Sequence, residues 1–533
     1  MDHFKPRPFA SLVAKAPVAL LLAAICLAAP IPLQAQGSVA SSLPLLGDGS
    51  AMSASAERRL GDRIARELYR DPDFIDDPVL TDYVQGIWLP LLAAARVRGD
   101  LTPELDERFA WRIVLGRDRS VNAFALPGGY FGVHLGLLAV VSSRDELASV
   151  LGHELSHVTQ RHISRLIAKN DQQTPWMIGA MILGALAASK SPEAGNALIV
   201  GGQALSAQSQ LNFSRDMERE ADRVGFGVMT QAGFEAQGFV SMFDKLQQAA
   251  RLNDTGAYPY LRSHPLTTER IADMQSRLPL GAPHSVDVVP GMTHAMLTAR
   301  ARVLSSPGVD ALRGWQEQAD HLAPSQAAAQ QAGTLYGATM ASSRLRDAAQ
   351  ARKQFARLQQ VVADDPEAAR QARWLGVEIE LAARDRSRPQ VLALADSVGL
   401  DLAKPGAVAL LRRPDILLQA QIAMQAGQNE VMDVVAQNLQ VWLVRQPQDA
   451  LAWQWLASLY AAQNQGLRAL RAEAEARVAQ LDYAGALDRL KAALDRLDKT
   501  AALKSSADHI DASIIDTRRR QIEALLREQA LES

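Results

Sequence analysis

One helical segment constrains the fold of this chain more than any other. Apolar residues recur at helical spacing from 143 to about 167, and His153 and His157 lie four residues apart near the middle. Side chains at this spacing share one face of a helix, so the two imidazoles can bind one zinc ion together, as in metallopeptidases. Glu154 can then take a proton from a water molecule at that metal. Two surface histidines on a helix are the alternative, which the capped, amphipathic segment disfavours.

The third metal ligand is expected to be a carboxylate. A catalytic zinc ion has three protein ligands and keeps one position for water, and Cys26, the only cysteine, lies in the N-terminal leader. Glu218, Glu220 and Asp222 lie together on a second predicted helix, 215–232. Glu218 and Asp222 share a face, which suits one ligand and one acceptor for an imidazole N–H. Spacing alone does not choose among the three, and an exposed helix with surface salt bridges is the alternative.

The N-terminal 36 residues have the pattern of a secretory signal peptide. Basic residues precede an apolar run at 18–29, and small residues after it offer a cleavage point. A membrane anchor would need a longer apolar run, and Ile25 before Cys26 disfavours a lipoprotein. Residues 37–54, rich in Ser, Gly and Ala, are predicted to be a linker. The mature chain would then contain no thiol, which excludes disulfides and a cysteine nucleophile.

The rest of the chain divides by pattern into two parts. Its 533 residues are too many for one core, and the net charge of −2 gives no basic field that would attract nucleic acid. We predict a mainly α (α+β) fold, with a helical zincin-type metallopeptidase domain and a small sheet at 55–282. Strands are expected at 111–115, 121–125 and 130–134, and further helices at 56–69, 78–96, 195–210, 235–252 and 267–277.

Residues 290–533 have the pattern of one helix after another with short breaks. Proline turns at 364–366 and 446–449 each open a new helix. Small residues alternate with large ones such as Trp374 and Trp453, as in the roughly 34-residue helix–turn–helix pattern of tetratricopeptide repeats. We therefore predict an all-α, tetratricopeptide-like repeat domain, with a generic helical bundle as the alternative.

An apolar stretch at 176–188 has several interpretations. Its length of about 13 residues is short for a membrane span. It fits a buried core helix, a helix that covers the active-site cleft, or a helix that makes peripheral contact with a membrane surface.

Together these motifs resemble the gluzincin peptidases that include HtpX and the CAAX prenyl proteases. The signature of that family, His-Glu-x-x-His followed by Glu-x-x-x-Asp, is present at 153–157 and 218–222. The segment Asn-Ala-Phe-Ala-Leu-Pro-Gly-Gly at 122–129 looks like the family's edge strand. Phe-Ser-Arg at 213–215 leads into its ligand helix, and Ser-His-Pro at 263–265 resembles its closing motif. The resemblance covers about residues 55–280.

This resemblance implies roles for individual residues. It implies one zinc ion per chain, with Glu154 as the catalytic base and Asp222 as the supporting acid. His264 would be a regulatory fourth ligand that holds the enzyme inactive. The implied zinc ligands are His153, His157 and Glu218, and the implied substrate-binding edge strand is formed by Asn122, Ala123, Phe124 and Ala125.

With a leader and a repeat domain, the chain is similar to the family's periplasmic branch of β-barrel assembly-enhancing proteases. That similarity implies a periplasmic zinc endopeptidase for quality control of misassembled outer-membrane proteins, with chaperone-like assembly activity. The repeat domain would dock on the outer-membrane β-barrel assembly machinery. Redox control is not expected, since the mature chain lacks the cysteines of that branch. Two alternatives remain: a periplasmic repeat-based chaperone or assembly factor with little proteolysis, and a structural zinc protein whose site His264 closes.

Overall fold

The computed structural model describes residues 52–169, 213–252, 257–279, 290–305, 308–323, 325–499 and 506–531. Several predictions fall outside these residues: the signal peptide, the linker as far as residue 51, the apolar stretch at 176–188 and the helix at 195–210. Among the helices that the structure describes, none combines the length and the apolar character needed to cross a bilayer.

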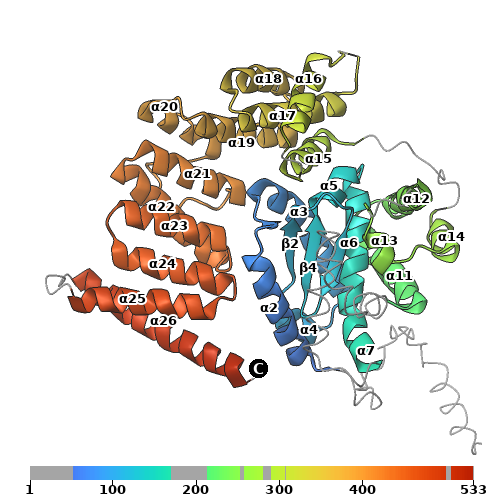
Figure 1. The fold of residues 1–533 in the computed structure, drawn as a ribbon, viewed down its shortest axis with the longest axis horizontal. Coiled ribbons are helices and arrows are strands. Elements are labelled where there is room, and N and C mark those ends of the chain that lie inside the picture. Colours follow the sequence, from blue (N-terminus) through green and yellow to red (C-terminus); the bar gives the residue numbers. More distant parts are fainter. Residues whose placement is uncertain are drawn as a thin grey trace, which may run out of the picture. The chain divides into compact units, whose positions relative to one another are not determined.

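The described part of the chain is mainly helical with one small sheet, which confirms the predicted fold class (Figure 1). The helices of the first half are α2 (Ala54–Arg70), α3 (Pro78–Arg98), α4 (Pro103–Arg108), α5 (Leu135–Val140), α6 (Arg144–Thr159), α7 (His162–Lys169), α11 (Arg215–Gln231), α12 (Gln237–Leu252), α13 (Tyr260–Ser263) and α14 (Thr268–Ser276). Those of the second half are α15 (Met292–Ser305), α16 (Val309–Asp320), α17 (Ala328–Arg344), α18 (Ala348–Val361), α19 (Pro366–Ala383), α20 (Arg388–Leu392), the 3-10 helix η1 (Ala395–Val398), α21 (Arg413–Ala426), α22 (Asn429–Arg445), α23 (Ala450–Ala462), α24 (Gly466–Ala479), α25 (Tyr483–Lys499) and α26 (Ser506–Leu531).

The sheet contains four strands: β1 (Phe74–Ile75), β2 (Arg112–Gly116), β3 (Ala123–Leu126) and β4 (Tyr130–His134). Their order is β1-β2-β4-β3, with β2 and β4 parallel and the other two pairs antiparallel. Gly128 and Gly129 close the turn between β3 and β4 with φ angles of 72° and 80°, a conformation that glycine adopts without strain. This topology leaves β3 at one edge of the sheet.

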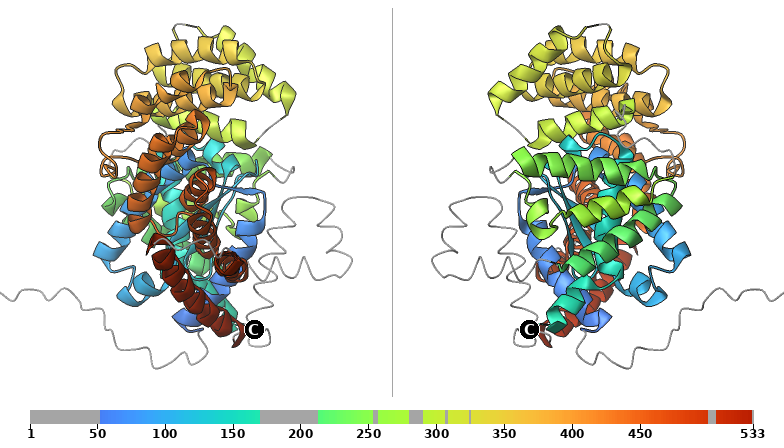
Figure 2. Two further views of the ribbon diagram at one scale, coloured as in Figure 1. Left: turned by 90° about the vertical axis from the view of Figure 1, so that its left-hand side faces the viewer. Right: turned by 90° about the vertical axis from the view of Figure 1, so that its right-hand side faces the viewer.

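The helix α6 lies between the sheet and the helices α11 and α12 (Figure 1; Figure 2, right). Its first turn is capped as the sequence predicts, because the Ser143 hydroxyl accepts a hydrogen bond of 3.1 Å from the Glu146 amide. Leu147, Leu151 and Leu155 are fully buried in the core that α6 shares with the sheet. The helix is therefore held on both sides along the length that carries the histidines.

The end of α6 differs from the prediction. Apolar periodicity continues to about 167, yet α6 stops at Thr159, Arg161 adopts a left-handed φ of 55°, and α7 begins at His162. The Arg161 guanidinium donates hydrogen bonds of 2.9 and 3.2 Å to Glu57 of α2. The change of direction thus coincides with a contact between distant segments, which local periodicity cannot encode.

A pair of glycines marks the crossing of α6 and α11. A Cβ atom added to Gly225 would lie 2.9 Å from the carbonyl carbon of Gly152 and from the amide nitrogen of His153. A Cβ atom added to Gly152 would lie 3.2 Å from the carbonyl oxygen of Gly225. The two backbones therefore approach more closely than side chains would allow. This crossing brings the start of α11 beside the histidines of α6.

In the second half of the chain, successive helices from α15 to α26 lie side by side (Figure 1). Gly376 of α19 lets the Phe355 ring of α18 approach, since a Cβ there would lie 2.5 Å from that ring. One hydrophobic core continues from the sheet and α6 into these helices, and Met52–Ser533 forms one compact unit. The division into domains at 282–290 stays a prediction.

Arginines of the second half bind carboxylates at the start of α3. Arg300 of α15 donates hydrogen bonds of 2.8 and 2.7 Å to Asp77. Arg413 of α21 bonds both oxygens of Asp76 at 2.6 Å and both oxygens of Asp449 at 2.8 and 2.9 Å. Such bidentate, charge-assisted bonds fix orientation as well as distance. They connect the helical second half to the start of α3 in the first half of the chain.

Candidate metal centre

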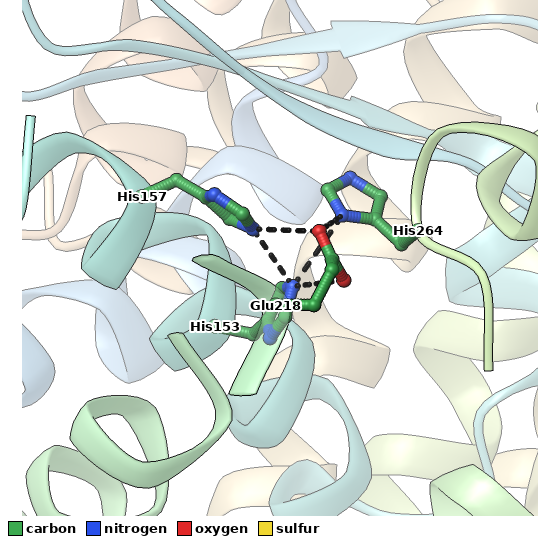
Figure 3. Close-up of side chains that lie close together, drawn as sticks. All are labelled: His153, His157, Glu218 and His264. Carbon is green, nitrogen blue, oxygen red and sulfur yellow. Dashed lines mark hydrogen bonds and ion pairs between the residues drawn. The ribbon is translucent and has the colours of Figure 1, made fainter. Parts of the chain in front are cut away.

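Three segments far apart in the sequence bring four metal-ligand side chains together. His153 and His157 come from α6 and Glu218 from the first turn of α11, and His264 directly follows α13 as its C-cap residue. One ligand atom of each lies within 4.8 Å of the others. Figure 3 shows all four side chains pointing toward one another. The structure thus gathers the three predicted zinc ligands and the predicted fourth ligand in one place.

The distances within this group are short. The Nε2 atoms of His153 and His157 are 3.0 Å apart, and the Glu218 carboxylate lies 3.6 and 3.5 Å from them. His264 Nδ1 is 3.0 Å from the Glu218 carboxylate and 3.4 Å from His153 Nε2. Imidazoles and a carboxylate that face one another are a donor set that divalent transition metals bind. The group can therefore hold a metal ion.

The protonation of these groups suits metal binding. Burial, together with repulsion from His153 and His264, holds the pKa of His157 well below its usual value. Burial alone would raise the pKa of Glu218, but the nearby His264 and other cationic groups leave that pKa below its usual value. A neutral imidazole and an ionised carboxylate are the forms that bind a metal ion.

Glu154 lies beside the group, and its buried carboxylate has no hydrogen-bond partner among the described residues. Its side chain is 1 % exposed, and its Oε1 atom lies 3.4 Å from His264 Nε2, an ion pair when that imidazole is protonated. A buried carboxylate without hydrogen bonds is costly. A metal ion among the neighbouring ligands, with a water molecule beside it, would supply the charge and the hydrogen bond that Glu154 lacks. The residues present therefore fit a metal ion.

His264 is held among aromatic and acidic neighbours. Its ring centroid lies 4.6 Å from that of Tyr260 and 5.7 Å from that of Phe213. Burial alone would lower the pKa of His264, but the carboxylates of Glu218 and Glu154 raise it. The same carboxylates that favour a protonated imidazole would favour a metal cation at this place. The role of His264 as a regulatory fourth ligand stays a prediction.

Asp222 lies behind His153, where a supporting acid was predicted. Its Oδ1 atom is 2.9 Å from His153 Nδ1. Arg270 donates two hydrogen bonds of 2.6 and 2.7 Å to Asp222, and its guanidinium also lies 2.7 Å from Glu218. Burial alone would raise the pKa of Asp222, but the bonds from Arg270 and His153 lower it. Sequence reasoning missed this role of Arg270, although two buried carboxylates require a nearby cation.

Glu220, the remaining candidate for the third ligand, lies outside the metal group. Its carboxylate is 3.0 Å from His162 Nε2 and accepts a hydrogen bond of 2.9 Å from Arg165. His162 is fully buried, and burial lowers its pKa to about 4. Its Nδ1 atom lies 2.9 Å from Nδ1 of His157. Sequence reasoning missed His162, because its spacing of five residues from His157 does not match one helix face.

The predicted substrate strand lies at the sheet edge, next to α6. The Asn122 carbonyl accepts a hydrogen bond of 3.0 Å from the His134 amide. Bonded and non-bonded pairs alternate along an antiparallel ladder, so the amide of Phe124 also faces β4. The amides of Ala123 and Ala125 then point away from β4, and neither has a backbone partner among the described residues; Ala123 is fully buried, whereas Ala125 is partly exposed. Substrate binding at these two amides stays a prediction.

The fold and the site together define a metallopeptidase domain. Residues 100–278 match Peptidase family M48, so the chain contains a domain of that family. This match confirms the resemblance seen in the motifs. It includes His153, Glu154, His157, Glu218 and His264.

Named relatives agree with this family. The chain is 35 % identical over 294 residues to a protein of Vibrio cholerae serotype O1 named "Putative beta-barrel assembly-enhancing protease", covering 54 % of this chain and 58 % of that protein. It is 32 % identical over 266 residues to the beta-barrel assembly-enhancing protease of Escherichia coli strain K12, covering 49 % and 51 %. The mitochondrial metalloendopeptidase OMA1 of Saccharomyces cerevisiae is 27 % identical over 201 residues, covering 37 % and 55 %. The chain spans about half the length of these relatives.

Proposed function

We propose that this chain is a zinc-dependent endopeptidase that acts in the periplasm on misassembled outer-membrane proteins. The observation that carries the proposal is the buried carboxylate of Glu154, which has no hydrogen-bond partner among the described residues, beside the group of His153, His157 and Glu218. A general base next to three zinc-type ligands is the arrangement that peptide hydrolysis requires.

The residues of the site divide the work of hydrolysis. A zinc ion held by His153, His157 and Glu218 would polarise a water molecule and the carbonyl of the bond to be cleaved. Glu154 accepts a proton from the attacking water as the oxygen adds to the carbonyl carbon. Glu154 then returns the proton to the leaving nitrogen as the C–N bond breaks. Asp222 keeps the His153 ring oriented during this sequence.

An extended substrate would lie along β3. The amides of Ala123 and Ala125 point away from β4, and they would donate hydrogen bonds to the backbone of a peptide that adds a strand to the sheet, first at the partly exposed Ala125. Backbone recognition of this kind selects unfolded or extended segments over folded ones. This selectivity fits the proposed role in removing proteins that have failed to assemble.

The names of the relatives support the proposed substrates and location. Relatives from two bacteria are named for β-barrel assembly, and the N-terminal pattern predicts export. The helical second half is proposed to be a tetratricopeptide-like domain that docks on the β-barrel assembly machinery. The stretch at 176–188 is proposed to make peripheral contact with a membrane or to cover the site.

A second candidate function is a periplasmic assembly factor or chaperone with little proteolysis. One observation favours it: His264 lies in the metal group where a catalytic zinc would keep a position for water. In that state the chain would bind unfolded barrels without cutting them.

Glu154→Gln, made in the full mature chain, tests the proposal. The variant should keep about one zinc ion per chain and lose cleavage of an unfolded outer-membrane β-barrel by about 10²–10⁴-fold, because the base is gone. Glu269→Gln on α14, whose side chain is 77 % exposed, is the matched control and should cleave normally. Cleavage that persists in Glu154→Gln would contradict the proposal. Binding of the barrel without cleavage by the unmodified protein would support the assembly factor.

A further inference from the structure

His162 contacts His157 of the metal group, although helical spacing alone would not bring these two side chains together. In a continuous helix residues 157 and 162 would point about 140° apart. The break after Thr159 and the left-handed backbone of Arg161 redirect the chain, so that His162 begins α7. The ring centroids of His157 and His162 are then 4.9 Å apart, with an angle of 76° between the rings.

A continuous set of contacts leads from the metal group to the surface through His162. Nδ1 of His157 is 2.9 Å from Nδ1 of His162. Nε2 of His162 is 3.0 Å from the Glu220 carboxylate, which Arg165 holds at 2.9 Å. His162 is fully buried, whereas the side chains of Glu220 and Arg165 are 39 % and 44 % exposed. The buried imidazole is therefore anchored at both of its nitrogen atoms.

The chemistry of imidazole fixes the direction of each hydrogen bond in this set. Nε2 of His157 faces the other ligands, so a neutral ring that binds a metal there carries its proton on Nδ1. That N–H needs an acceptor, and Nδ1 of His162 can accept only if the proton of His162 is on Nε2. A proton on Nε2 is then donated to the Glu220 carboxylate. One arrangement of protons satisfies every partner.

We propose that His162 is a positioning residue, which accepts the Nδ1–H of His157 and thereby aims Nε2 of His157 at the metal. Glu220 holds His162 in the tautomer that makes this possible. The inference rests on the proposed metal binding by His153, His157 and Glu218. It assigns separate roles to three carboxylates of α11: Glu218 binds the metal, Asp222 supports His153 directly, and Glu220 supports His157 through His162.

The test compares zinc affinities of the full mature chain, measured by competition with a chromophoric chelator. His162→Phe keeps a ring of similar size but cannot accept a hydrogen bond, and it should weaken zinc binding by about 10–100-fold. His162→Gln offers an amide oxygen to His157 and an amide N–H to Glu220, so it should restore most of the affinity. The visible absorption spectrum of the Co²⁺-loaded protein should change in His162→Phe and resemble that of the unmodified protein in His162→Gln.

A second pair of variants keeps the inference testable if His162→Phe does not fold. Glu220→Ala removes the outer acceptor and should weaken zinc binding by several-fold. Asp216→Ala, on the same helix with a side chain 84 % exposed, is its control and should bind zinc normally. Melting temperatures of the zinc-free proteins show whether packing has changed.

The outcomes separate this inference from the proposed function. If His162→Phe folds and its zinc affinity is unchanged, the inference is overturned and the proposed function stays intact. If His162→Phe does not fold, an unchanged zinc affinity in Glu220→Ala has the same consequence. An affinity in His162→Gln as low as in His162→Phe also overturns it, because hydrogen bonding would then not be the cause. Failure of the unmodified protein to bind zinc overturns both.

Discussion

At the scale of single residues, His264 is a fourth ligand-type side chain in a group where three suffice for catalysis. If it latches the site, His264→Ala should raise the rate of peptide cleavage, including self-cleavage, because the position for water is freed. Zinc content should stay near one per chain, since three ligands remain. Cleavage rate and metal content of the purified variant check this expectation.

The direction of the change distinguishes the roles of His264. If it donates a hydrogen bond to the developing oxyanion, the same substitution lowers the rate instead. A rate equal to that of the unmodified protein would exclude both roles. His321→Ala is the control, because His321 is exposed and lies in the second half of the chain.

At the scale of elements, the crossing of α6 and α11 sets the distance between Glu218 and the histidines. Gly225→Ala adds a Cβ atom that would lie 2.9 Å from backbone atoms of Gly152 and His153, so the helices must separate. We expect a loss of about 1–3 kcal/mol in the free energy of unfolding, together with weaker zinc binding. Denaturant titration and chelator competition measure the two effects. Gly86→Ala in α3 is the control, since a Cβ there has no neighbour within 4 Å.

The second expectation at this scale concerns β3. Ala125→Pro removes an amide that faces the open edge, so cleavage of an extended peptide should fall by about 2–10-fold through a higher KM, while the sheet stays folded. Ala125→Ser keeps the amide and should cleave normally. Phe124→Pro should unfold the sheet instead, since that amide faces β4. Unchanged KM values for Ala125→Pro, with circular dichroism confirming the fold, would exclude this edge as the substrate site.

At the scale of the whole molecule, Arg413 connects the two halves by binding Asp76 and the N-cap residue Asp449. Burial alone would raise the pKa of Asp449, but the bonds from Arg413 and Trp442 lower it. The stability that Asp449 contributes is therefore complete above the usual aspartate pKa near 4, and it is lost as the pH falls through the lower folded value. Asp449→Asn should cost about 1.5–3 kcal/mol at pH 7, and this difference should shrink toward pH 3.

Urea unfolding of both proteins between pH 3 and 7 measures that difference. Asp401→Asn is the control, because the Asp401 side chain is 45 % exposed, forms an ion pair with the exposed Lys404 and accepts a hydrogen bond from the Ala403 amide, which an asparagine oxygen can also accept. A difference between Asp449→Asn and the unmodified protein that stays constant with pH would mean that the Asp449 charge contributes nothing to folding.

The sequence predicts the parts of this structure that depend on local pattern. The cap at Ser143, the strands around Phe124 and the facing of His153 and His157 all follow from spacing of 2, 3 or 4 residues. The early end of α6 could not be predicted, because Arg161 bonds Glu57 from a distant helix. Whether Glu218 or Glu220 reaches the histidines likewise depends on where α11 crosses α6. The spacing of residues along either helix does not contain the position of that crossing.

The hydrogen bonds of Arg270 determine how His264 could leave the metal group. Arg270 donates to the Pro265 carbonyl at 2.8 Å while it holds Asp222. The amide of His264 itself donates to the Tyr260 carbonyl at 2.9 Å. The backbone is thus tied on both sides of the imidazole. Opening the site would be a rotation of one side chain about its own bonds, a small and reversible movement that leaves the surrounding loop and the ligand helix in place.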